Sequence, residues 1–129
     1  LMKINKVDFT LCFRYLSKAL VGDIKSIKNL FKNDIAFDNW MTLWKERITQ
    51  ESISDENIAS SMNAVNPIYI PRNHKVEKAI DAAVLDNNID PFLKLHDILK
   101  SPYEEIKEFH EYEKPAKNSL AGYKTFCGT

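Results

Sequence analysis

Apolar side chains recur along most of the chain at intervals of three and four residues, which is the spacing of one face of an α-helix. The first half of the sequence predicts four helices of this kind. Their apolar stripes lie within residues 11–19, 24–31 and 37–48 and after residue 54, with Asp8, Asp23 and Ser54 as amino-terminal caps and Gly22 and Pro67 as stops. We therefore expect four helices before the first proline.

A segment with two prolines, residues 66–71, separates these helices from the second half of the chain. We expect this segment to be extended or turn-like, because proline is excluded from a helix interior. Behind it, residues 76–84 carry the cleanest amphipathic pattern in the sequence. A further helix is predicted to begin with Asp90 as its cap and a proline as its first residue, and another to begin with a capping box between Ser101 and Glu104.

The helical periodicity is lost from about residue 111 onward. The pattern predicts an all-α fold of about six short helices, with one compact helical domain over residues 1–110, an extended proline-containing connector, and an irregular tail over residues 111–129. The chain has only three glycines and no run of strand-like alternation, which argues against a β-sandwich or a glycine-rich phosphate loop.

Composition excludes several classes of partner. Eighteen Lys and Arg residues balance eighteen Asp and Glu residues, so no basic stripe is available to neutralise nucleic-acid phosphates. Apolar residues make up 44% of the chain, too many for disorder, and no apolar run approaches the roughly 20 residues of a membrane span. Cys12 and Cys127 are too few for a disulfide framework. We expect a neutral cytoplasmic protein that binds neither nucleic acid nor membranes.

Residues that could carry chemistry are sparse. The three histidines lack the spacing of a helical zinc site, and no nucleophile-elbow motif is present, so the sequence predicts no catalytic or metal-binding residue. Trp40 and Trp44 lie one helical turn apart and could stack on a ligand. We favour packing in a core, because aromatic pairs at this spacing usually serve that purpose.

Five polar residues gather around the two prolines, namely Asn63, Asn66, Arg72, Asn73 and His74. Side chains that bond backbone groups are useful where proline has removed a backbone donor. We therefore favour a polar clamp that holds a rigid connector, with ligand binding as the alternative.

The two cysteines differ in their surroundings. Cys12 lies on an apolar helical face and is predicted to be a buried, inert thiol. Cys127 lies in the predicted tail, where an exposed thiol could reach a distant cysteine.

Five stretches carry specific motifs: DFTLCFRYLS at residues 8–17, FDNW at 37–40, MNAVNPIYIPRNHKVEKAI at 62–80, LHDILKSPY at 95–103 and TFCGT at 125–129. Each resembles a stretch of the carboxyl-terminal signature of the selenoprotein O family, and the resemblance extends over essentially all 129 residues. The sequence departs from the family pattern at Ile68, where many members carry a basic residue.

The resemblance implies that the chain is the carboxyl-terminal part of a longer bacterial, cytoplasmic protein. Family members have a protein-kinase-like fold, bind ATP with Mg²⁺ or Mn²⁺, and transfer AMP to Ser, Thr or Tyr hydroxyls of proteins. The family's metal motifs lie upstream of the matched region, so this part is expected to be inactive alone. The implied partners are the kinase-like amino-terminal domain of the same protein and, through the full-length enzyme, its protein substrates.

The resemblance also implies a role for Cys127, which matches the family's carboxyl-terminal cysteine. By this resemblance, we expect Cys127 to pair with a cysteine in the kinase-like domain and so to gate activity by redox state. Two alternatives stay open: a stand-alone helical module that docks a protein partner, and an approach of Arg72, Asn73 and His74 to the nucleotide, since guanidinium and amide donors suit phosphate oxygens.

Overall fold

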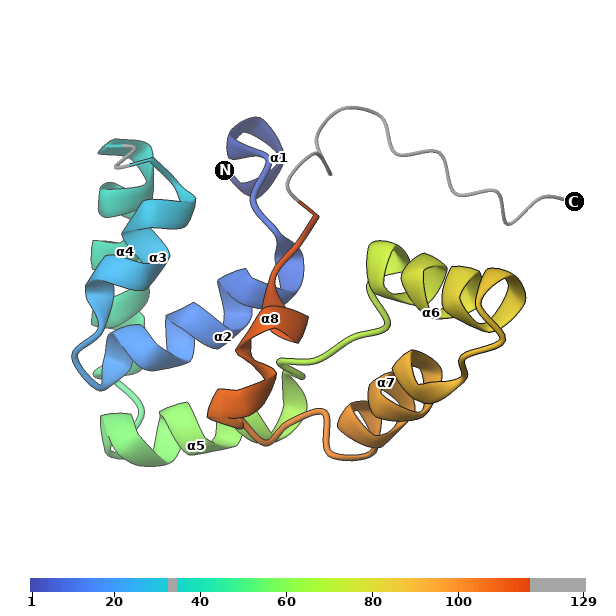
Figure 1. Cartoon of the computed structure of the whole chain (residues 1–129). Coiled ribbons are helices and arrows are strands. Elements are labelled where there is room, and N and C mark those ends of the chain that lie inside the picture. The colour runs from blue at the N-terminus through green and yellow to red at the C-terminus, as the bar shows by residue number, and fades with distance from the viewer. Residues whose placement is uncertain (33–34, 117–129) are drawn as a thin grey trace, which may run out of the picture. The chain divides into compact units, whose positions relative to one another are not determined.

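The computed structural model describes residues 1–32 and 35–116, and these residues form helices joined by short loops (Figure 1). No strand occurs within the described ranges, which confirms the prediction of an all-α fold. The chain divides into two compact units, and the boundary along the sequence lies between Asn66 and Pro67. Cys127 lies outside the described residues, and the predicted boundary between a domain over 1–110 and a tail over 111–129 stays a prediction.

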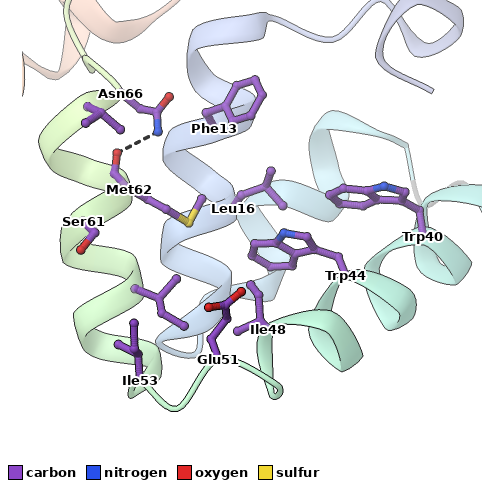
Figure 2. A pocket seen from close by; sticks show the side chains of 12 residues that line it. Phe13, Leu16, Trp40, Trp44, Ile48, Glu51, Ile53, Ser61, Met62 and Asn66 are labelled. Carbon is purple, nitrogen blue, oxygen red and sulfur yellow. Dashed lines mark hydrogen bonds between the residues drawn. The ribbon is translucent and has the colours of Figure 1, made fainter.

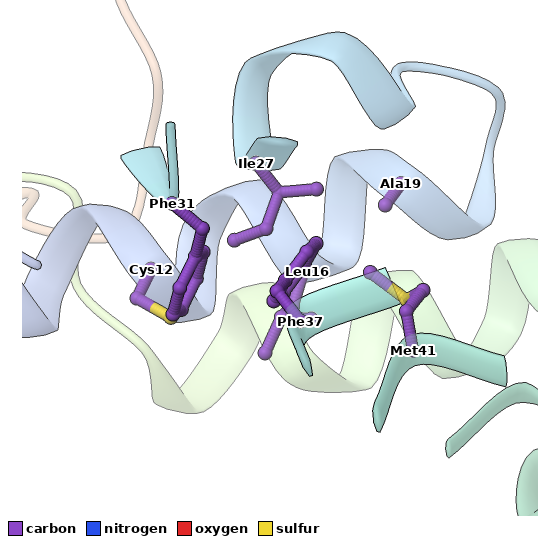
Figure 3. Packing of buried hydrophobic residues seen from close by; sticks show 7 residues of the cluster. All are labelled: Cys12, Leu16, Ala19, Ile27, Phe31, Phe37 and Met41. Carbon is purple, nitrogen blue, oxygen red and sulfur yellow. The ribbon is translucent and has the colours of Figure 1, made fainter. Parts of the chain in front are cut away.

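The first unit is built around a central helix, α2. Its helices are α1 (Met2–Asn5), α2 (Phe9–Leu20), α3 (Ile24–Leu30), α4 (Ile35–Ile48) and α5 (Asp55–Val65). Helices α3 and α5 both pack on α2. The core beside α2 consists of buried apolar side chains from α2 to α4, namely Cys12, Leu16, Ala19, Ile27, Phe31, Phe37 and Met41 (Figure 3). The rings of Phe31 and Phe37 stack with centroids 4.2 Å apart, which holds the start of α4 against the end of α3.

The three predicted caps of this unit are confirmed. A carboxylate oxygen of Asp8 accepts a hydrogen bond from the Leu11 amide at 2.9 Å, and Asp23 accepts one from the Ser26 amide at 3.1 Å. The Ser54 hydroxyl accepts from the amide at the third position of α5. Each cap satisfies an amide that has no partner inside its own helix, which is why these helices begin where the sequence indicated.

Replacing Asp8 with alanine is expected to lower the free energy of unfolding by about 1 kcal/mol, because the first turn of α2 loses its side-chain acceptor. Urea unfolding followed by tryptophan fluorescence measures this loss in the first unit, where both tryptophans of the chain lie. Asp8→Asn keeps an amide oxygen at the same position and is the matched control. Equal losses for the two variants would contradict the capping role.

The second unit begins with the extended connector and continues into a helical hairpin. Its elements are α6 (Asn73–Leu85), α7 (Asp90–Lys100), the 3₁₀-helix η1 (Lys107–Phe109) and α8 (His110–Glu113). Helices α6 and α7 pack on each other. A small core forms where the connector meets α7, with Ile68, Tyr69 and Ile98 buried and Leu99, Phe109 and Tyr112 around them.

The connector is extended, as predicted, and its residues Ile68 and Tyr69 are buried. The amides of Ile68 and Tyr69 both donate to the Pro102 carbonyl, at 2.7 and 3.2 Å. The Tyr69 hydroxyl accepts from the Ile106 amide at 2.9 Å and donates to the Ile106 carbonyl at 3.0 Å. These bonds tie the connector to the loop after α7, so residues distant in sequence supply the backbone partners that a helix would otherwise provide.

Two predicted helix starts in this unit are wrong. Residues 101–104 form a turn, because the Pro102 carbonyl and the Ile106 amide, which a helix would pair with each other, are both bonded to the connector. Asp90 is the first residue of α7 and not its cap. The cap position is occupied by Ile89, and the side chain of Asn88 accepts from the Asp90 amide at 3.0 Å.

The clean amphipathic stripe of α6 is only partly buried. Ala79 faces the interior, whereas Ile80 is 53% exposed and Val84 is 74% exposed. An apolar cavity of about 270 Å³ lies between α6 and α7 and includes Ile80 and Phe92 among its lining residues. The apolar spacing of α7 would favour a partly buried His96, but its ring is exposed and stacks on Phe92. The sequence pattern indicates how much of the α6 surface is apolar, and α7 covers only part of that surface.

Candidate functional site

A polar cluster lies inside the first unit, where α2 meets the carboxyl end of α5. One terminal nitrogen of Arg14 (Nη1) donates to the carbonyl oxygens of Asn63 and Asn66, each at 3.2 Å. The Ser17 hydroxyl lies 2.6 Å from the Asn63 side-chain oxygen. The Asn66 side chain donates to the Met62 carbonyl at 2.8 Å. Arg14 and Ser17 are both buried, so this cluster lies in the interior.

The cluster is placed where the backbone needs it. The last carbonyls of a helix have no amide partner within the helix and carry its partial negative charge. The Arg14 guanidinium supplies two of the missing hydrogen bonds and a positive charge at the end of α5. Arg14 therefore fixes α5 against α2 and sets the point at which α5 gives way to the connector.

The five polar residues predicted around the prolines are divided between the two units. Asn63 and Asn66 belong to the Arg14 cluster. Arg72, Asn73 and His74 belong to the second unit, at the start of α6. The structure thus gives the two asparagines a shared partner within the first unit, and the sequence alone did not identify that partner.

Arg14 and Ser17 were not predicted as site residues from the sequence. Their signal was a pair of polar residues, one helical turn apart, within a helix whose other buried positions are Leu11, Cys12, Leu16 and Ala19. Both also lie in the DFTLCFRYLS motif. A polar pair on a buried helical face needs a hydrogen-bond partner, and this requirement could have pointed to the asparagines.

The second polar group lies at the beginning of α6. Arg72 is buried at the cap position, Asn73 is exposed, and His74 is partly buried. Loss of hydration lowers the pKa of His74 below its usual value, and the positive charges of Lys75 and Arg72 lower it further. These effects favour the uncharged form of the His74 imidazole at the beginning of the helix.

An apolar hollow of the first unit lies between α4 and α5, over α2, and has a volume of about 640 Å³ (Figure 2). We call it the α4–α5 groove. Apolar side chains from all three helices and from the loop before α5 line most of it, namely Phe13, Leu16, Trp40, Trp44, Ile48, Ile53, Ile58, Met62 and Val65. Glu51, Ser61 and Asn66 are the remaining lining residues.

The two tryptophans line this groove, and Trp44 also packs against the core, so the predicted core packing is confirmed for Trp44 and wrong for Trp40. Their rings stack with centroids 5.9 Å apart, and Trp40 remains 37% exposed. The buried side chains of α4 are Phe37 and Met41. The apolar surface of α4 extends over more than one side of the helix. One side packs in the core, and the adjacent side lines the groove.

Cys12 is buried, as the sequence predicted, and only 3% of it is exposed. Burial raises the pKa of its thiol to about 11, with a further contribution from the Asp8 carboxylate. Because the thiolate is the nucleophile, Cys12 is unreactive near neutral pH for two reasons, its protonation and its lack of access.

The raised pKa of Cys12 predicts a loss of stability in alkali. The unfolded chain releases the thiol proton near pH 9, whereas the folded chain holds it until about pH 11. The free energy of unfolding should therefore fall between pH 9 and 11, by about 3 kcal/mol in total for a shift of this size. Urea unfolding across this range, compared with Cys12→Ala to remove the contribution of other groups, measures the effect. Parallel pH profiles for the two proteins would contradict it.

Within the part of the chain that the structure describes, no three His, Cys, Asp or Glu side chains converge as a metal site would require. Across residues 1–32 and 35–116, no helix has the length and apolarity needed to cross a membrane.

The structure of the described residues therefore defines an all-helical protein region. Its first unit contains the buried Arg14 cluster and the open α4–α5 groove. A family model described as protein adenylyltransferase SelO matches residues 1–100. The chain belongs to this family, which confirms the resemblance to selenoprotein O proteins drawn from the motifs.

Similar curated proteins carry the name protein nucleotidyltransferase YdiU. The one from Maridesulfovibrio salexigens is 40% identical over 129 residues, and the one from Agrobacterium fabrum is 38% identical over 129 residues. Each alignment covers 100% of this chain and 26% of the relative. The chain thus spans about a quarter of the length of these relatives, and the matched region lies at their carboxyl end. No solved structure matches the chain.

Proposed function

We propose that this chain is the carboxyl-terminal helical region of a protein adenylyltransferase, which uses ATP and Mg²⁺ or Mn²⁺ to transfer AMP to Ser, Thr or Tyr hydroxyls of proteins. The observation that carries this proposal is the match of the adenylyltransferase family model to residues 1–100. Alignment of the whole chain with one quarter of longer nucleotidyltransferases supports it.

The described residues do not fit a site for metal-bound ATP. Such a site needs carboxylates that converge on the metal and basic groups that meet the phosphates. No suitable carboxylate set converges in the described ranges, and no Lys or Arg lines the α4–α5 groove. The proposal therefore places the transfer chemistry in the part of the full-length protein that precedes this chain, and it gives this chain a structural and regulatory role.

The regulatory part of the proposal concerns Cys127. Its thiol would form a disulfide with a cysteine of the kinase-like domain, while oxidised glutathione accepts the two electrons and two protons that the thiols release. The burial and raised pKa of Cys12 support this assignment, because they remove the other cysteine of the chain from thiol exchange.

Intact-mass spectrometry tests the catalytic part. The chain and the full-length protein are each incubated with ATP, Mg²⁺ or Mn²⁺ and an acceptor protein. We expect adenylyl adducts only with the full-length protein. Adducts made by the chain alone would contradict the accessory role, and no adducts from either protein would favour a stand-alone interaction module.

The regulatory part has its own prediction. Cys127→Ser in the full-length protein should abolish the difference in adenylyl transfer between samples treated with oxidised glutathione and with a reducing agent. Cys12→Ser is the control and should preserve that difference. An unchanged redox response in Cys127→Ser would refute the gating role and leave the adenylyltransferase assignment intact.

A further inference from the structure

The α4–α5 groove is an apolar surface that the first unit leaves open. Its floor is formed by Phe13 and Leu16 of α2, and its walls carry Trp40 and Trp44 on one side and Met62 on the other (Figure 2). We infer that, in the full-length protein, an apolar segment of the polypeptide that precedes this chain fills the groove. This inference rests on the proposed function only in placing the chain at the carboxyl end of a longer protein.

Both walls of the groove have more apolar surface than the unit uses. On α4, Phe37 and Met41 are buried in the core, whereas Trp40 and Trp44 extend the apolar surface beyond it. On α5, Ala59 is buried, whereas Ile58, Met62 and Val65 line the groove, and Val65 is 71% exposed. Contiguous apolar surface of this kind is costly in water and marks an interaction site.

The charges of the groove determine the chemistry of its occupant. Glu51 is the one ionisable residue that lines it, and Arg47 pairs with Glu51 at 2.6 Å. The lining therefore offers no unpaired charge for a phosphate, a nucleotide or an acidic peptide. Ser61, on α5, and Asn66, at the end of α5, add uncharged polar groups to the lining. An apolar side-chain surface fits this lining, as when a helix lies in a hydrophobic groove.

The length of the relatives indicates where this surface comes from. About three quarters of each relative lies outside the region that matches this chain. That portion is covalently attached, so its effective concentration at the groove is far above that of any free protein. A segment of the preceding polypeptide is therefore the occupant that the observations favour over a second copy of the chain or a separate protein.

Two adjacent serines of α5 give a matched test. Ser61 lines the groove, whereas its neighbour Ser60 does not, and both side chains are exposed. Ser61→Cys and Ser60→Cys are conservative changes at exposed positions, so both variants should fold. Each is introduced into the full-length protein and into the isolated chain, and alkylation by iodoacetamide is followed by peptide mapping, which separates the new cysteine from Cys12 and Cys127.

In the full-length protein, we expect alkylation of Ser61→Cys to be at least about tenfold slower than alkylation of Ser60→Cys, because a filled groove must open before the reagent enters. In the isolated chain the two rates should be similar. Equal rates in the full-length protein would overturn the inference. Protection that appears only when an acceptor protein is added, or only at high protein concentration, would instead assign the groove to a substrate or to a second copy.

Adenylyl transfer by the same samples separates this inference from the proposed function. Full-length variants that transfer AMP but leave Ser61→Cys reactive would refute the groove assignment alone. A protected Ser61→Cys in a protein that makes no adducts would support the groove assignment and refute the proposed activity.

Discussion

Replacing Arg14 with alanine is expected to lower the free energy of unfolding of the first unit by about 3 kcal/mol. The substitution removes the donor shared by the carbonyl oxygens of Asn63 and Asn66, each 3.2 Å from Arg14 Nη1. These carbonyls close the end of α5, and a partly buried acceptor that loses its donor is left incompletely satisfied. The loss also includes the packing of the long arginine side chain, which is only 3% exposed.

Urea unfolding followed by tryptophan fluorescence measures this effect, since both tryptophans lie in α4 of the same unit. Arg47→Ala is the matched control. Arg47 is also an arginine of the first unit, but its ion pair with Glu51 is exposed, so its removal should cost about 0.5 kcal/mol or less. If Arg14→Ala lowers the free energy of unfolding no more than Arg47→Ala does, the hydrogen bonds of Arg14 do not stabilise the fold.

Arg14→Met separates the hydrogen bonds from the packing. Methionine fills much of the same space without a donor, so it should recover part of the packing loss and none of the hydrogen-bond loss. We expect Arg14→Met to lie between wild type and Arg14→Ala. Full recovery by methionine would assign the role of Arg14 to packing alone.

Tyr69→Ala is expected to destabilise the second unit by about 4 kcal/mol, because it removes a large buried ring from a small core. Tyr69→Phe keeps the ring and removes only the hydroxyl, which bonds both the amide and the carbonyl of Ile106. This smaller change should cost about 2 kcal/mol, since both backbone groups lose their partner.

Hydrogen exchange at the Ile106 amide is the direct measurement, because the Tyr69 hydroxyl accepts from this amide at 2.9 Å. Exchange should become about tenfold faster or more in Tyr69→Phe. Tyr112→Phe is the control, because Tyr112 packs on the same core and this variant also loses only a hydroxyl. The aromatic ring is kept, and with it the contact to the Lys75 ammonium, which lies 4.8 Å from the ring centroid. Equal exchange rates in Tyr69→Phe and wild type would show that the bond is not formed in solution.

The features of the fold that depend on interactions between residues close in sequence were correctly predicted. Asp8, Asp23 and Ser54 cap the helices at the positions assigned to them, because a cap bonds an amide only two or three residues away. The proline segment was correctly predicted to be extended, since proline restricts its own residue and the one before it. The family was also correctly identified, because its long motifs are continuous in the sequence.

The candidate site was less predictable, because it depends on which helices meet. The asparagine pair at residues 63 and 66 was identified from the sequence, but its partners Arg14 and Ser17 lie more than forty residues earlier. Trp40 was placed in the core with Trp44 because spacing gives the apolar face of a helix without saying what covers it. The groove that they line exists only because α4 and α5 lie on either side of α2.

By itself, the sequence determined the helical class, the helix caps, the buried state of Cys12 and the family, all of which depend on short-range spacing or on continuous motifs. The tertiary structure decided that Pro102 and Ile106 bond the connector instead of forming a helix, that Arg14 closes the end of α5, and that two tryptophans line an open groove. These features arise from contacts between residues far apart in the chain, and the free energy of such contacts overrides local helix preference.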